Sequence, residues 1–299
     1  VGAKSLNTKN VYGRISSCNW LKYPESFSIP FNVFEYFLTL PENQEISQKI
    51  QKYIKKLNET DKQKKILKYL ERCKQETLKI NFSENKETLH LKSRLLQFGI
   101  KPNEIDEAFK AIKGVWASKF NERVYIASSK VGVSLNEIKM SVLCQKIIPS
   151  EYAYVIHTKN PTNNNQDEVY AEIVAGMGET LVGAFEGQSL SFAYNKRNGN
   201  YNILSYPNKG ISLRNSGFIF RSDSNFEDIE GFSGAGLFDS IPMCEYNTID
   251  MVYFNEKLFA DSGFIDNMIR RIAQIGIAVE ELYGAPQDIE GAYNQGDFY

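Results

Sequence analysis

Histidines, paired cysteines, net charge and long apolar runs are all scarce in this 299-residue chain, and each scarcity argues against a class of function. The two histidines, His90 and His157, stand in no recognisable Ser-His-Asp or Cys-His arrangement, so the sequence does not favour hydrolase-type nucleophilic catalysis. The four cysteines are scattered without a C-x-x-C pair. This pattern argues against a zinc site or a disulfide framework and favours a reducing compartment.

Low net charge and modest hydropathy argue against two kinds of partner. The formal charge is −1 at pH 7, so no overall field attracts nucleic acid or an anionic membrane surface. No apolar run approaches the roughly 20 residues of a membrane-spanning helix. We therefore expect an intracellular protein that binds neither nucleic acid nor membrane. Any anion would have to be bound by a local cluster of residues.

The residue pattern changes along the chain. From about 43 to 113 the sequence is rich in lysine and glutamate, with apolar residues at helical spacing, which predicts a helical insertion with solvated charges. After residue 140 the apolar runs are short and typical of strands, and a helix is predicted at about 264–283 with Gly284 at its end. The strands are predicted at about 140–148, 152–158, 169–174, 189–194 and 217–221. These features predict a mixed α/β fold.

The stretch 218–240 carries the densest functional chemistry. A strand-like apolar run leads through Arg221 into a loop of hydroxyls, carboxylates and glycines. A polyphosphate site needs a guanidinium for paired oxygen contacts, backbone N–H groups, and carboxylates that hold a counter-cation. A polar surface loop between two strands is the alternative.

Two glycine-containing segments could also approach a nucleotide. Gly176 and Gly178 precede Glu179 after a predicted strand, where glycines let the backbone approach a ligand closely. An ordinary strand-to-helix turn explains them equally well. Near the N-terminus, Gly2–Ser5 is similar to an anion site at the start of a helix, with Lys4 as a point charge.

Two pairs of charged residues complete the set of candidates. Lys119 and Arg123 would be one turn apart in a helix and could face the same anion, although a surface turn salt-bridged by Glu122 is the alternative. Asp288 and Glu290 would lie on one side of a strand, because side chains alternate with period two. Together they would suit Mg²⁺, a cation that prefers oxygen ligands, whereas the solubility of an edge strand is the competing explanation.

Taken together, these segments resemble the nucleotide-binding domain of the alpha-glucan water dikinase family. The matching stretches occur in family order along nearly the whole chain. They read V-G-A-K-S, S-I-P-F-N-V-F-E, V-W-A-S-K-F-N-E-R, V-I-H-T-K-N-P, A-G-M-G-E-T-L-V-G-A, F-R-S-D-S-N-F-E-D-I-E-G-F-S-G-A-G-L-F-D-S and E-E-L-Y-G-A-P-Q-D-I-E-G. Pyruvate phosphate dikinase and phosphoenolpyruvate synthase are wider relatives.

The resemblance implies an ATP-grasp fold, with ATP between two lobes and the whole of residues 1–299 forming one nucleotide-binding domain. It implies phosphate contacts from Lys4 and from the Lys119 and Arg123 pair, and a loop at 176–179 that closes over the nucleotide. Arg221 is the strongest candidate for contact with the transferred phosphoryl groups, and Arg123 is the alternative. The segment implied to flank the adenine and form the hinge comprises Gln145, Lys146, Ile147 and Ile148. Glu290 and Asp288 would hold Mg²⁺.

The activity implied is a dikinase reaction. ATP phosphorylates a histidine on a separate swivelling domain and AMP is released; one phosphate passes to water and the other to an α-glucan such as starch or amylopectin. That domain, and a family strand of the V-V-Q-T-R-P type, are not in this chain. We therefore expect a fragment of a longer enzyme that binds ATP weakly and cannot phosphorylate glucan alone. A phosphoglucan dikinase, a dikinase with a small acceptor such as pyruvate, and an inactive nucleotide-binding module are the alternatives.

Overall fold

The computed structural model describes residues 2–15, 20–183, 185–229, 232–234 and 236–299, which form two units built from distant segments. The first unit contains Glu25–Lys146, Gly217–Met243 and the N-terminal residues through Thr8. The second contains Lys9–Pro24, Ile147–Ser216 and Cys244–Tyr299. Both units combine helices with sheet, so the predicted mixed α/β class is confirmed. Helix α1 (Ala3–Ile15) begins in the first unit and continues into the second.

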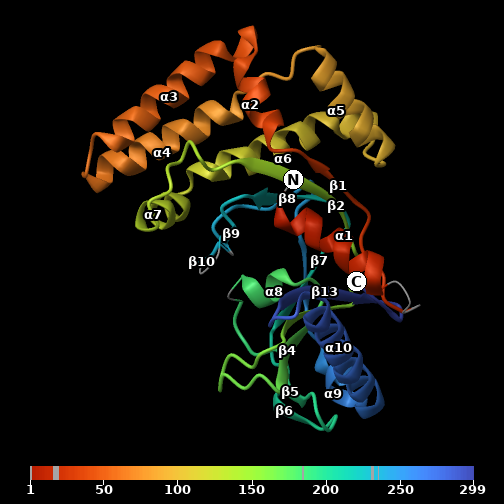
Figure 1. Ribbon diagram of the computed structural model, residues 1–299. Coiled ribbons are helices and arrows are strands. Elements are labelled where there is room, and N and C mark those ends of the chain that lie inside the picture. The colour runs from red at the N-terminus through yellow and green to blue at the C-terminus, as the bar shows by residue number, and fades with distance from the viewer. Residues whose placement is uncertain (1, 16–19, 184, 230–231, 235) are drawn as a thin grey trace. The chain divides into compact units, whose positions relative to one another are not determined.

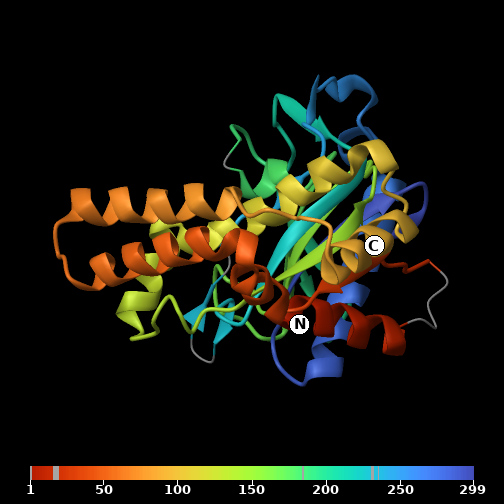
Figure 2. The same ribbon diagram turned by 90° about the horizontal axis from the view of Figure 1, so that it is seen from above.

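Helices dominate the first unit and occupy the stretch that was predicted to be helical. Helices α3 and α4 lie side by side (Figures 1 and 2). The buried face of α3 carries Ile50, Ile54 and Leu57 at helical spacing, as the apolar pattern predicts. The longer elements are α2 (Asn32–Thr39), α3 (Gln44–Asn58), α4 (Gln63–Leu78), α5 (Lys86–Gln97), α6 (Ile105–Ala117) and α7 (Glu122–Lys130). Short 3₁₀ turns are η1 (Pro41–Asn43), η2 (Pro102–Glu104) and η3 (Ser118–Phe120).

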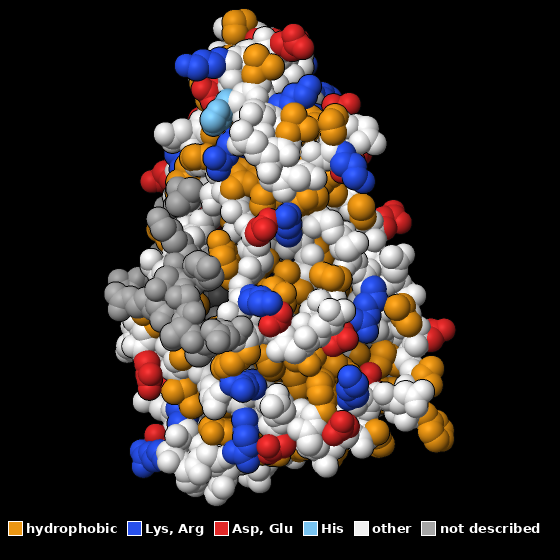
Figure 3. Space-filling view, turned by 90° about the vertical axis from the view of Figure 1, so that its right-hand side faces the viewer, with side chains coloured by type: hydrophobic (Ala, Val, Ile, Leu, Met, Phe, Trp, Pro, Cys, Tyr) orange, Lys and Arg blue, Asp and Glu red, His pale blue; other side chains and the backbone are white. Residues whose placement is uncertain are grey.

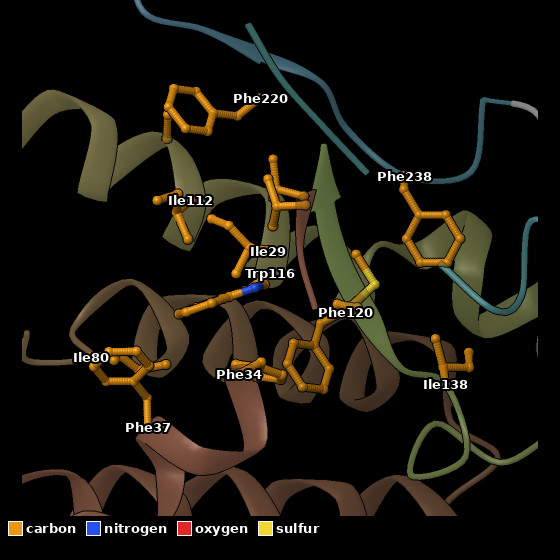
Figure 4. Packing of buried hydrophobic residues seen from close by; sticks show 14 of the residues in the cluster. Ile29, Phe34, Phe37, Ile80, Ile112, Trp116, Phe120, Ile138, Phe220 and Phe238 are labelled. Atoms are coloured by element: carbon orange, nitrogen blue, oxygen red, sulfur yellow. The ribbon is translucent and has the colours of Figure 1, made fainter. Parts of the chain in front are cut away.

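The sheet of the first unit has the strand order β1-β2-β8-β11. Its core includes Trp116 of α6, whose ring lies 5.2 Å from that of Phe34 (Figure 4). Phe220 of β8 joins the same core. Because side chains alternate along a strand, Arg221 and Asp223, one and three residues later, point to the opposite face of the sheet. The strands are β1 (Ser26–Ile29), β2 (Met140–Ile147), β8 (Gly217–Ser224) and β11 (Ile241–Pro242), and β9 (Asp228–Ile229) pairs separately with β10 (Phe232–Ser233).

The second unit is an antiparallel sheet with a long helix along one face (Figure 1). Helix α10 (Ser262–Tyr283) is capped by the Asp261 side chain, which accepts from Phe264 N, and it ends at Gly284 with φ +67°. A Cβ at Gly276 would lie 3.0 Å from Ile156, so glycine lets the helix pack closely on the sheet. The strand order β14-β13-β3-β4-β5-β6 comprises Asp297–Phe298, Asp288–Asn294, Tyr152–His157, Glu168–Ala175, Leu190–Asn195 and Tyr201–Ser205.

Smaller elements lie on the second unit's remaining connections. Strands β7 (Ile211–Arg214) and β12 (Asn247–Asp250) form an antiparallel pair. The short helices are α8 (Glu179–Val182), α9 (Lys257–Ala260) and the 3₁₀ turn η4 (Tyr253–Asn255). Within the described ranges, no helix has the length and apolar character of a membrane span. On the face shown in Figure 3, basic and acidic side chains are interspersed rather than gathered by sign.

Candidate functional site

The N-terminal segment of the first unit is held on β8 by one carboxylate. Asp223 is fully buried and accepts hydrogen bonds from Gly2 N at 2.8 Å, Lys4 N at 2.9 Å and Ser5 Oγ at 2.6 Å. Ser141 Oγ lies 3.2 Å from the same carboxylate. A Cβ at Gly2 would overlap Asp223, so the approach requires glycine. The anion at the start of α1 is therefore the protein's own carboxylate, which corrects the interpretation of Gly2–Ser5 as an open anion site at a helix N-terminus.

The side chain of Lys4 is also fixed by this strand. Its ammonium group donates to the carbonyl oxygen of Ser222 at 3.1 Å and forms an ion pair with Glu227, which is buried. Arg221 lies on the same face of β8 as Asp223, since the two are separated by one residue of a strand. Lys4 is therefore held on the strand that contains Arg221.

Two carboxylates of the 218–240 stretch bind other groups of the protein itself. Asp223 binds the N-terminal segment and Glu227 pairs with Lys4. The expectation that this loop's carboxylates hold a counter-cation is therefore not supported for these two. Residues Glu230, Gly231 and Ala235 of the same motif lie outside the described residues.

Lys119 and Arg123 do not share one helical face, which corrects the assumption behind their pairing. Lys119 belongs to η3 and Arg123 to α7, and Asn121 between them is extended, with ψ 143°. Arg123 donates to the carbonyl oxygen of Leu237 at 2.7 Å and pairs with Asp239. The alternative interpretation expected an ion pair with Glu122 in the same turn, whereas the partner of Arg123 is Asp239.

Lys119 itself is buried, with 6% of its surface exposed. Its ammonium group lies 5.8 Å from the ring centre of Phe34 and 5.9 Å from that of Phe120. Burial lowers the pKa of Lys119 to about 8, because the charged form loses its hydration, and nearby Glu35 only partly offsets this. With a pKa of about 8 the amine is still mostly protonated at pH 7, so this buried cation is a candidate for binding an anion.

The predicted hinge segment coincides with a division between the two units. Gln145 and Lys146 are the last residues of the first unit at this point, and Ile147 and Ile148 are the first of the second. Gln145 pairs with Ser26 of β1, so the segment leaves the sheet of the first unit here. Lys146 Nζ pairs with Glu25, and the Lys146 amide donates to the Glu25 carbonyl at 2.9 Å.

In the second unit, the glycine segment forms the turn from β4 into α8. Gly176 has φ +83°, and a Cβ there would overlap Ser212 and Leu213, so this position requires glycine for packing. Gly178 has no such requirement, since its Cβ would meet only Ala153 at 3.7 Å. Glu179 begins α8 and accepts a hydrogen bond from Tyr246 Oη at 2.8 Å. The predicted strand-to-helix turn is confirmed, and a role in nucleotide closure stays a prediction.

Asp288 and Glu290 lie on one face of β13, as the alternation predicts. Asp288 is opposite His157 on β3, and Glu290 is opposite Val155. His157 Nδ1 and Asp288 Oδ1 are 2.7 Å apart. This hydrogen bond raises the pKa of His157 and lowers the pKa of Asp288, so the pair favours the charged imidazolium and carboxylate.

Asp288 and Glu290 have too few neighbouring carboxylates to surround a magnesium ion by themselves. Glu172 lies on the same face as Glu290 with Val155 between them, two strand spacings or about 10 Å away. Glu172 already accepts from Tyr170 Oη at 2.9 Å and Ser189 Oγ at 2.7 Å. Among the described residues, no group of three or more acidic, histidine or cysteine side chains could hold a metal ion. Any Mg²⁺ held by Asp288 and Glu290 would need further ligands from phosphate oxygens and water, as this ion commonly requires.

Residues 74–299 match a protein family described as "Pyruvate phosphate dikinase, AMP/ATP-binding domain". The chain belongs to this AMP/ATP-binding domain family. The expectation of an ATP-binding domain related to pyruvate phosphate dikinase is thus confirmed.

Individual relatives of this AMP/ATP-binding domain confirm the resemblance to alpha-glucan water dikinases that the motifs predicted. The chain is 41% identical over 309 residues to "Alpha-glucan water dikinase, chloroplastic" of Solanum tuberosum. It is 38% identical over 301 residues to "Alpha-glucan water dikinase 2" of Arabidopsis thaliana. A phosphoenolpyruvate synthase of Pyrococcus furiosus is 25% identical over 192 residues, which cover 64% of the chain. The chain spans only 20 to 23% of the length of these three relatives.

Two features of the AMP/ATP-binding domain were missed from the sequence. Asp223 was interpreted as a loop carboxylate, although it is the buried acceptor for the N-terminal segment. For His157 a nucleophilic catalytic arrangement was considered and not favoured, although the residue pairs with a candidate magnesium ligand. A carboxylate two residues after Arg221 was a local hint, but its partners lie about 220 residues away in sequence.

Proposed function

We propose that this chain binds MgATP as the nucleotide-binding part of an alpha-glucan water dikinase. The single observation that carries the proposal is the relation to the potato and Arabidopsis dikinases over the full length of the chain. The whole enzyme would convert ATP, α-glucan and water into AMP, phosphoglucan and phosphate. A phosphohistidine on a separate swivelling domain would carry the phosphoryl group, and other domains would bind starch or amylopectin.

The candidate residues divide by unit. From the first unit, Lys4 and Arg221 would bind the phosphate chain, and Lys119 and Arg123 are further candidates. From the second unit, the segment Gly176–Glu179 would cover the nucleotide. Ile147 and Ile148, with Gln145 and Lys146, would flank the adenine and present backbone groups to it. We propose that all of residues 1–299 act as one ATP-grasp domain, with the helices at about 43–113 as an insertion.

The chemical task of these residues is electrostatic. Phosphoryl transfer needs little covalent participation from the protein, so catalysis rests on alignment of the phosphates and neutralisation of their charge. Arg221 would offer paired N–H donors to phosphate oxygens, and Lys4 would supply a point charge. Asp288 and Glu290 would hold Mg²⁺, which neutralises the phosphate chain when bound. His157 would hold Asp288 in place through the 2.7 Å contact.

The location of the reaction is proposed by analogy. Relatives from Solanum tuberosum and Citrus reticulata are named as chloroplastic, which favours an intracellular, plastidic or cytoplasmic setting for this protein. A dikinase with a small acceptor is the second candidate, because the matches to phosphoenolpyruvate synthases cover 64 to 65% of the length of the chain. The acceptor would be chosen by domains outside this chain.

Calorimetric titration of MgATP tests the proposal. We expect Arg221→Ala and Glu290→Ala to weaken binding by about tenfold or more, since each would remove a charge-assisted contact of about 1.5–3 kcal/mol. Arg197→Ala and Glu281→Ala are matched controls on exposed positions of the second unit and should leave affinity unchanged. A folded wild-type chain that does not bind MgATP, or equal effects of all four variants, would contradict the proposal.

A further inference from the structure

The attachment of the N-terminal segment to β8 is polar rather than apolar. Of residues 2–7, only Gly2 is buried, and Leu6, the large apolar side chain of the first turn, is 51% exposed. The fully buried Asp223 carboxylate instead accepts from Gly2 N, Lys4 N and Ser5 Oγ. A buried carboxylate is tolerated only when such donors replace its hydration. The position of this segment therefore depends on Asp223.

The geometry also fixes which way Lys4 faces. Asp223 accepts a hydrogen bond from the backbone N–H of Lys4 at 2.9 Å, while the ammonium group of the same residue donates to the Ser222 carbonyl at 3.1 Å. The ammonium group also forms an ion pair with Glu227. Backbone and side chain of Lys4 are thus bound by two successive residues of β8. Arg221 precedes them in the strand and shares the face of Asp223. One short stretch of strand therefore sets the position of Lys4 with respect to Arg221.

We propose that Asp223 is a positioning residue for the phosphate site, which holds Lys4 beside Arg221 so that both cations bind one phosphate chain. The inference rests on the proposed MgATP binding and adds a residue that contacts no nucleotide itself. Asp223 acts through the backbone of residues 2–5, because its oxygens are occupied by their donors. Electrostatic stabilisation depends on charges that are placed before the ligand arrives, so a displaced Lys4 would bind phosphate poorly.

The inference is tested by comparing the affinities of the variants for MgATP and for adenosine. Asp223→Asn keeps the shape of the side chain and removes its charge. We expect it to weaken MgATP binding by about tenfold, the effect of one lost charge-assisted contact, and to leave adenosine binding unchanged because adenosine has no phosphate. Ser5→Ala removes one donor only and should weaken ATP binding less. Asp261→Asn is the matched control, since its carboxylate caps α10 in the second unit.

A double-mutant cycle with Lys4→Met separates positioning from general stability. If Asp223 acts through Lys4, Asp223→Asn should weaken ATP binding by less than about twofold in the Lys4→Met background. Equal losses for ATP and adenosine, or undiminished loss in that background, would overturn the inference.

Failure of the inference and failure of the proposed function give different results. If wild-type chain binds MgATP and Lys4→Met weakens it, but Asp223→Asn does not, only the positioning role is overturned. If the folded wild-type chain does not bind MgATP, the proposed function fails and the nucleotide role of Asp223 with it. Amide hydrogen exchange at Lys4 then still reports on the hydrogen bond from the Lys4 amide to Asp223. The exchange should speed up in Asp223→Asn and stay slow in Asp261→Asn.

Discussion

Replacement of Lys119 by methionine should stabilise the protein. Lys119 is 6% exposed, and its ammonium group lies over the rings of Phe34 and Phe120. Within the described part of the chain, no ion pair or hydrogen bond of this ammonium group is found. A charge buried against aromatic rings loses more hydration than such contacts return. Methionine fills a similar volume without a charge.

The magnitude follows from the pKa, which burial lowers from 10.5 to about 8. A difference of about 2.5 pKa units corresponds to about 3 kcal/mol that the charged lysine costs the folded state. Because the folded pKa lies below the unfolded one, this cost is fully present below pH 8 and disappears as pH rises toward 10.5. The loss of the cation–π contacts of this desolvated ammonium group offsets about 2 kcal/mol of the gain, so we expect a net stabilisation of about 1 kcal/mol at pH 7.

Urea unfolding of wild type and Lys119→Met between pH 7 and pH 10 checks this prediction. The stability advantage of the variant should shrink as pH rises, since the wild-type lysine loses its proton more readily in the folded state. Lys130→Met, at an exposed position of α7, is the control and should change stability little. A variant that is less stable than wild type at pH 7, or an advantage that does not vary with pH, would refute the reasoning. Weaker MgATP binding by the stabilised variant would support the phosphate role proposed for Lys119.

Two further predictions concern β13. Gly291→Ala should destabilise the second unit by about 1–3 kcal/mol, because its Cβ would overlap the buried ring of Tyr154, whereas Gly210→Ala meets no neighbouring atom; thermal unfolding that is equal for both would contradict this. The His157–Asp288 pair should stabilise the fold by less than about 1 kcal/mol, since Asp288 is largely exposed. Its contribution should be greatest between about pH 4 and 6.5, and fade as pH rises through the raised pKa of His157 or falls through the lowered pKa of Asp288. Stability of His157→Gln that tracks wild type across this range would show that the pair contributes nothing.

Elements with strong periodic patterns were predictable from the sequence. Helix α10 was predicted at about 264–283 and spans Ser262–Tyr283, because a long apolar stripe and Gly284 mark it locally. The alternation in β13 correctly placed Asp288 and Glu290 on one face. The helical spacing of Lys119 and Arg123 was misleading, because Asn121 between them is extended. A spacing argument holds only while the backbone keeps one conformation across the interval.

The N-terminal segment shows why the rest of the site could not be predicted. Gly2 and Lys4 alone are compatible with a phosphate site at the start of a helix, since glycine allows close approach and lysine supplies charge. The close approach is instead that of Asp223, whose carboxylate a Cβ at Gly2 would overlap. The glycine therefore serves the internal anion, and the ammonium group of Lys4 is itself paired with Glu227. A single sequence contains both partners but no local pattern that joins them, because the contact depends on a tertiary fold across about 220 residues.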